Sequence, residues 1–62
     1  MNKYRLNPNQ QMFKEEAANA LAVKAGLLNV LGRKNEAMST IDEAYNIDVT
    51  DIVLQYRDII YG

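Results

Sequence analysis

Few residues of this chain could do chemistry, and their spacing does not match a catalytic site. Ser39 and Thr40 could act as nucleophiles, but the sequence contains no histidine to serve as their base. A serine–lysine pair remains the one open alternative. Asp42 and Glu43 are adjacent in sequence, so on a helix their carboxylates point about 100° apart and do not converge on one substrate atom. We therefore expect a protein that is not an enzyme.

Cofactor and metal sites are not expected either. Cysteine and histidine are both absent, which removes the usual zinc ligands and excludes a disulfide-stabilised fold. Gly26 and Gly32 have neither a strand pattern before them nor a Gly-Lys-Ser sequence after them, so they do not form a phosphate-binding loop. We predict no catalytic residue, no cofactor and no metal.

The charge pattern argues against nucleic acid as a partner. Seven basic and eight acidic side chains leave the chain nearly neutral, whereas nucleic-acid binders usually carry a basic face. Residues 21–26 do have the alanine-then-glycine spacing of a DNA-reading helix-turn-helix. In that register, however, buried positions of the recognition helix would fall on Gly32 and Asn35. A small dimeric DNA-binding regulator is therefore the alternative, not the main prediction.

The apolar runs are too short for a membrane span. Lys24 and Asn29 interrupt these runs, so their length is far below the roughly 20 residues that a membrane span needs. The basic start is followed by the polar segment 7–11, where a secretory signal would be apolar. We expect a soluble, cytoplasmic protein without a membrane partner.

The elements that must position any site are helices. We predict a flexible arm over residues 1–6 and three helices at about 8–31, 35–47 and 49–61. Asn7 and Pro8 suit the first helix start, Gly32 suits its end, and Asp48 is placed to cap the third helix. This is a single all-α domain with a long first helix and an antiparallel hairpin. Because 62 residues bury little surface, we expect oligomerisation to complete it.

The first helix has more apolar surface than one hairpin can cover. At about 100° per residue, one stripe is expected to pack inward: Phe13, Ala17, Leu21, Leu28 and Leu31. Val23, Leu27 and Val30 lie well round the helix and are expected to meet another chain. Lys24 sits within the first stripe, where its stem can cover apolar surface while the ammonium reaches water. The alternative is a pair between Lys24 and a carboxylate across an interface.

The later helices show clearer stripes. In the second helix, Ala37, Ile41, Ala44 and Tyr45 are predicted to face inward, with Met38 beside them. In the third helix the predicted inward stripe comprises Val49, Ile52, Val53, Tyr56 and Ile60. Leu54 is expected to face away from it.

The central stretch, residues 21–48, resembles a single tetratricopeptide repeat. The resemblance covers about 30 residues and is carried by Leu21, Ala25, Leu28, Gly32, Ala37, Ile41, Ala44 and Asp48. Lys24 and Val49 depart from the pattern, and Leu21 stands where a large aromatic residue is usual. The resemblance implies a protein-binding hairpin that stacks on the third helix and on a second chain, since a lone repeat cannot bury its face.

These observations predict a small non-catalytic interaction module. We expect an adaptor or inhibitor, of the kind carried by mobile elements, that binds a protein partner or itself as a homodimer through a helix face. A purely structural oligomer subunit is the second alternative. The predicted partner-binding residues are Val23, Lys24, Leu27, Val30, Tyr56 and Tyr61.

Overall fold

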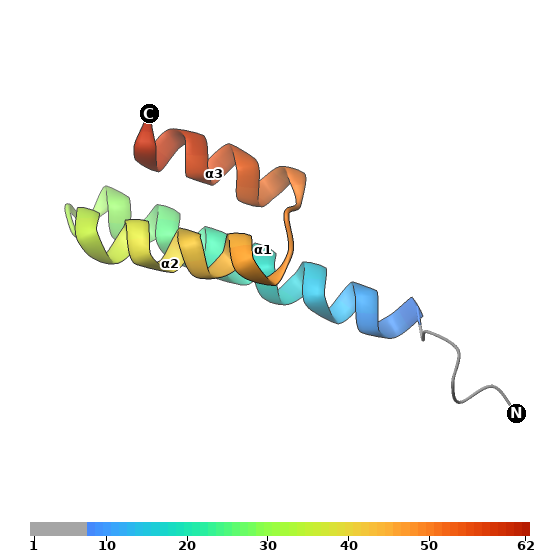
Figure 1. Ribbon diagram of the computed structural model, residues 1–62. Coiled ribbons are helices and arrows are strands. Elements are labelled where there is room, and N and C mark those ends of the chain that lie inside the picture. The colour runs from blue at the N-terminus through green and yellow to red at the C-terminus, as the bar shows by residue number, and fades with distance from the viewer. Residues whose placement is uncertain (1–7) are drawn as a thin grey trace, which may run out of the picture.

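The computed structural model describes the backbone of residues 8–62 and the side chains of residues 12–62. Three helices span this range, α1 (Pro8–Val30), α2 (Lys34–Ile47) and α3 (Asp51–Tyr61), and the described residues contain no strand (Figure 1). The predicted all-α class is confirmed, and each helix begins and ends within two residues of its expected bounds. The expected arm over 1–6 and the Asn7 cap lie outside the described residues.

The turn between α1 and α2 follows the prediction made for Gly32. Gly32 has a φ of +84°, a left-handed conformation that glycine adopts without steric cost. Its N–H donates to the Asn29 carbonyl at 3.1 Å, and the Arg33 N–H donates to the Leu28 carbonyl at 2.9 Å. This pair of bonds is the Schellman motif, which satisfies carbonyls left unpaired at the end of a helix.

The start of α3 differs from the prediction. Thr50, not Asp48, is the N-cap: its hydroxyl accepts a hydrogen bond from the Val53 N–H at 3.1 Å. Asp48 instead ends α2, where its N–H donates to the Ala44 carbonyl. A cap must lie within three residues of the N–H that it binds. Because three residues connect α2 to α3, the N-cap position is 50 and not 48.

The core is small and rich in alanine. Its fully buried residues, which come from all three helices, are Ala18, Ala22, Ala25, Ala37, Ile41, Ala44, Val53 and Ile60. Leu21, Leu28, Met38 and Tyr56 pack against them, partly buried. The inward positions predicted for Ala37, Ile41, Ala44, Val53 and Ile60 are confirmed.

The inward stripe predicted for α1 is partly wrong. Phe13 is 65% exposed and Leu31 is 69% exposed, and Ala17 is also exposed. The buried line is Ala18, Ala22 and Ala25, because helices that pack closely need small side chains at the contact. Only Leu21 and Leu28 of the predicted stripe reach the core.

Three further side chains are less buried than predicted. Tyr45 is 39% exposed, Val49 is 49% exposed and Ile52 is 38% exposed. Val49 precedes α3 and therefore lies off its helical stripe, while Tyr45 and Ile52 lie at the edges of their helices. Leu54, expected to face away, is 45% exposed.

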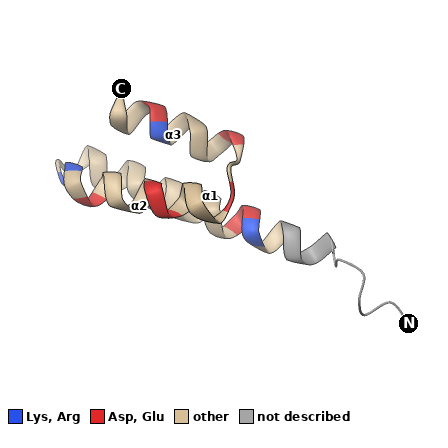
Figure 2. Ribbon diagram, in the orientation of Figure 1, with Lys and Arg blue, Asp and Glu red and all other residues tan. Residues whose placement is uncertain are grey.

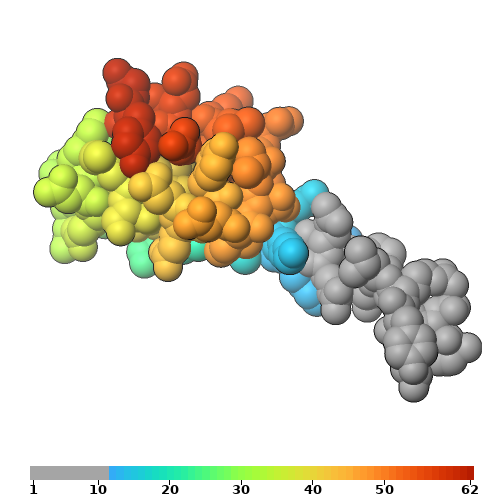
Figure 3. All heavy atoms as spheres, in the orientation of Figure 1, coloured from blue at the N-terminus to red at the C-terminus, as the bar shows by residue number. Residues whose placement is uncertain are grey.

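The helices form an antiparallel hairpin, α1 with α2, over which α3 runs in the direction of α1 (Figure 1). The pairing of α1 with α2 is the most extensive of the three, as the predicted hairpin requires. The N-terminal part of α1 extends past the ends of α2 and α3, and residues 12–17 are all exposed. Figure 3 shows this part of α1 leaving the compact body of the molecule.

Candidate functional site

The candidate site is the side of α1 turned away from α2 and α3. Val23, Leu27 and Val30, the residues expected to meet another chain, are 44%, 61% and 82% exposed. Phe13 belongs to the same side at about 100° per residue, and Leu31, which directly follows α1, is exposed as well. We call this surface the outer face of α1, defined by Phe13, Ala17, Ala20, Val23, Leu27, Val30 and Leu31, all of which are exposed.

The outer face continues onto α3. The Tyr56 ring lies against Gly26: a Cβ on Gly26 would come within 2.7 Å of the ring's Cδ1. Val23 and Val30 lie about one turn either side of Gly26. On α3, the exposed Ile52 and Ile59 lie about one turn before and one turn after Tyr56, on the same side of that helix. Exposed apolar side chains from both helices therefore lie next to the α1–α3 contact.

Tyr56 contributes mainly to packing within the chain. It is half-buried between α1 and α3, which leaves only part of the ring for a partner. A glycine at position 26 is what allows this ring to lie directly on the helix backbone.

Tyr61 is held in a polar cluster between α2 and α3. Its hydroxyl donates to the Asp42 carboxylate, with distances of 3.0 and 2.9 Å to the two oxygens. The Arg57 guanidinium carbon lies 4.6 Å from the centre of the Tyr45 ring and 5.2 Å from that of Tyr61, which is cation–π range. Arg57 Nε is also 3.9 Å from Asp42. The sequence did not indicate a structural role for Arg57. Its contacts join two helices, and such contacts leave no periodic spacing in the sequence.

This cluster changes the acidity of one phenol. The hydrogen bond to Asp42, followed by desolvation and the negative charge of Asp42, raises the pKa of Tyr61 above its ordinary 10.0, while Arg57 opposes the shift. The Tyr61 side chain is exposed, and Asp42 is the acceptor of its hydroxyl hydrogen.

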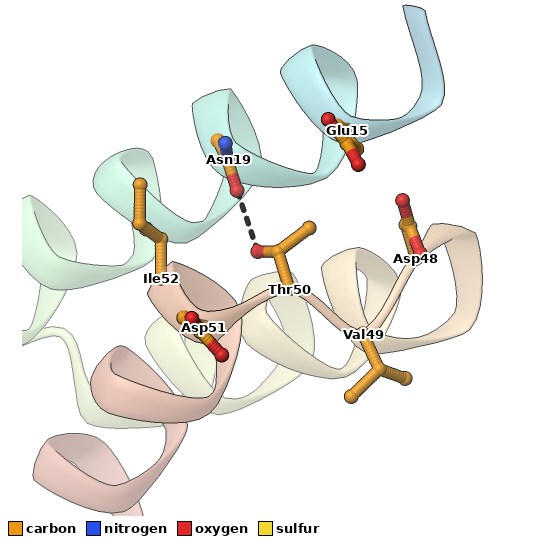
Figure 4. A pocket seen from close by; sticks show the side chains of 7 residues that line it. All are labelled: Glu15, Asn19, Asp48, Val49, Thr50, Asp51 and Ile52. Atoms are coloured by element: carbon orange, nitrogen blue, oxygen red, sulfur yellow. Dashed lines mark hydrogen bonds between the residues drawn. The ribbon is translucent and has the colours of Figure 1, made fainter. Parts of the chain in front are cut away.

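A shallow acidic hollow of about 580 Å³ lies where α1 passes the α2–α3 connection (Figure 4). Thr50 donates its hydroxyl hydrogen to the Asn19 amide oxygen at 2.6 Å across it. Glu15, Asp48 and Asp51 also line it. Among the described residues, no three acidic side chains are grouped closely enough to hold a metal ion.

A second open hollow of about 590 Å³ lies beside the α1–α2 turn and contains the candidate nucleophiles. Lys24, Ser39 and Thr40 line it together with Arg33 and Glu36. Lys24 is thus at the edge of the outer face, exposed and next to the half-buried Leu28. The described hydrogen bonds include none between Lys24 and either hydroxyl.

Among the described residues, basic and acidic residues are interspersed along the helices. In Figure 2 the described basic residues are spread over α1, the α1–α2 turn and α3, interleaved with acidic ones. No helix in the described part of the chain is long and apolar enough to cross a membrane.

The chain was compared with family models, curated proteins and solved structures. No family model, no curated protein and no solved structure matches it.

Proposed function

We propose that this protein is a non-catalytic interaction module that binds a protein partner through the outer face of α1. The observation that carries the proposal is the exposure of Val23, Leu27 and Val30 together with Phe13 on one side of α1, with Leu31 exposed directly after the helix. Monomeric soluble proteins rarely leave a contiguous apolar surface of this kind uncovered.

The geometry suits recognition of another helix. A helix presents an apolar stripe to a partner through residues spaced three and four apart. The spacing of Val23, Leu27 and Val30 follows this rule, and Lys24 adds a charge at its edge. Binding through this face is how an adaptor or inhibitor of the expected kind would act. The tetratricopeptide-like interpretation of residues 21–48 remains a separate prediction.

A matched pair of substitutions tests the proposed face. Leu27→Glu puts a charge on the outer face, and Leu54→Glu puts one on an exposed leucine of α3 that faces elsewhere. We expect Leu27→Glu to abolish capture of a specific protein from a lysate of the producing cell and Leu54→Glu to leave it intact. Both variants should keep the helical circular dichroism of the unmodified protein.

Where a protein is captured, equal loss in both variants, or capture that survives Leu27→Glu, would refute the outer face as the site that binds it. The DNA-binding alternative has its own test, because retention on DNA that rests on phosphate contacts falls steeply with salt. Absence of retention at low salt would remove it.

A further inference from the structure

The side chains on the outward side of α1 have a symmetrical order about Ala20. Three residues either side of it are Ala17 and Val23, which are apolar. Seven residues either side are the large Phe13 and Leu27, which are 65% and 61% exposed. The small residue is thus at the centre, and the bulky ones are at equal distances from it.

The charges near this centre are also complementary. Glu16 lies four residues before Ala20 and Lys24 lies four residues after it, and both are exposed. Neither takes part in the ion pairs that the described residues form, which join Arg33 to Glu36 and Arg57 to Asp42. Each is therefore available to a partner.

We propose that the partner of the outer face is a second copy of this chain, whose α1 packs antiparallel against the first with the two-fold axis at Ala20. This inference rests on the proposed function and names the partner. In this register each Phe13 lies level with the partner's Leu27, and each Ala17 lies level with the partner's Val23. The two alanines at the axis let the helix backbones approach closely.

Charge selects the antiparallel orientation. With the axis at Ala20, each Glu16 lies level with the partner's Lys24, so the dimer contains two equivalent opposite-charge pairs. Parallel helices in register would instead place Glu16 beside the same residue of the partner, and likewise for Lys24. Like charges at such a seam disfavour an assembly, and polar residues within an apolar stripe commonly fix register and orientation.

The length of α1 suits this arrangement. Residues 12–17 are all exposed and belong to the end of α1 that extends past α2 and α3. In the antiparallel pair this extension lies along the partner's residues 23–28, where Val23 and Leu27 are exposed. Each copy therefore covers apolar surface that the other leaves open.

Charge reversal tests both the partner and the orientation. Glu16→Lys or Lys24→Glu alone would convert both pairs into like-charge contacts, and we expect sedimentation equilibrium to show dimerisation weakened about tenfold or more. The double variant Glu16→Lys/Lys24→Glu restores opposite charges and should regain the unmodified dissociation constant within about threefold. Glu43→Lys, on the exposed side of α2, is the control and should leave dimerisation unchanged.

Engineered cysteines test the register, because the chain has none of its own. Ala20→Cys places two thiols together at the axis and should give a disulfide-linked dimer on mild oxidation. Glu16→Cys should not, since an antiparallel pair separates its two thiols by roughly 12 Å along the helices. Efficient cross-linking of Glu16→Cys would overturn the antiparallel arrangement.

The inference and the proposed function can fail separately. A protein that stays monomeric at every soluble concentration would overturn the inference. If Leu27→Glu but not Leu54→Glu then lost capture of a lysate protein, the proposed function would still hold, with a different partner. A dimer insensitive to both charge reversals would also overturn the inference. Failure of the function would appear as neither dimerisation nor Leu27-dependent capture.

Discussion

Gly26 and Tyr56 make one contact on which the position of α3 depends. The ring occupies the space that a side chain at position 26 would need. Replacing glycine by alanine in a helix normally stabilises it by about 1 kcal/mol. Here we expect Gly26→Ala to destabilise the protein by about 1 kcal/mol in urea denaturation, because overpacking costs about 1–3 kcal/mol.

The control for this prediction is the same substitution in a background with a smaller side chain at position 56. In Tyr56→Ala, Gly26→Ala should become stabilising by about 1 kcal/mol, the helix-propensity gain alone. If Gly26→Ala has the same sign in both backgrounds, the ring does not determine the effect.

Tyr61 gives the fold a dependence on alkaline pH. Its pKa is raised in the folded protein by the hydrogen bond to Asp42, by desolvation and by the charge of Asp42. The protonated phenol is therefore favoured by folding, so its contribution to stability is fully present below pH 10.0 and is lost as the pH rises through the folded pKa. Tyr61→Phe should reduce the loss of stability measured by thermal melts above that pH.

The same shift can be read directly from phenolate absorbance. In Asp42→Asn, which removes the carboxylate charge and the charged acceptor, the pKa of Tyr61 should move down toward its ordinary value. The Tyr61 signal is assigned by comparison with Tyr61→Phe. An unchanged titration in Asp42→Asn would show that Asp42 does not cause the shift.

At the scale of elements, Thr50 fixes where α3 begins and how it sits on α1. Its hydroxyl accepts from the Val53 N–H and donates to Asn19. Thr50→Ala loses both bonds, and we expect a destabilisation of about 1–2 kcal/mol in urea denaturation. Thr50→Ser keeps the hydroxyl and should cost less than about 0.5 kcal/mol.

Asp48→Ala is the matched comparison for that substitution. The hydrogen bonds of the described residues include none from the side chain of Asp48, so its removal should change stability by less than about 0.5 kcal/mol. A larger loss from Asp48→Ala than from Thr50→Ala would contradict the cap seen here and favour the one expected from sequence.

The difference between these two caps shows which features of the helices are readable from sequence. Gly32 was predictable because a left-handed residue after a helix has a single-residue signature. The Thr50 cap was not, since Asp48 and Thr50 are both good cap residues and only the length of the connection chooses between them. The contacts of Tyr61 and Arg57 with residues of α2 could not be predicted, because they depend on how α3 lies on α2.

The inner face of α1 was misread for a related reason. Phe13 and Leu31 are strongly apolar, and a hydrophobic pattern places such residues inside. The structure buries Ala18, Ala22 and Ala25 instead, since close packing against α2 depends on size as well as polarity. The spacing of these three alanines was the available signal. Phe13 and Leu31, which were expected inside, instead extend the outer face and so enlarge the candidate site.

At the scale of the whole molecule, the core is small for a chain that must fold alone. Of the eight fully buried residues among the described side chains, five are alanines, and the larger ones are Ile41, Val53 and Ile60. Alanine contributes little apolar surface, so burial within one chain stabilises the fold weakly. Pairing of two α1 helices would add apolar burial that a single chain does not provide.

Stability should therefore depend on protein concentration. Folding linked to dimerisation is driven by mass action, and for a domain of this size each tenfold rise in concentration should raise the melting temperature by about 3–5 °C. Glu16→Lys should melt at a lower temperature than the unmodified protein with a weaker concentration dependence, and Glu16→Lys/Lys24→Glu should recover both. Glu16 is exposed, so its substitution leaves the core of each copy intact. Melts that coincide across concentrations for the unmodified protein would show that one chain is stable by itself, with the outer face of α1 open to a different protein.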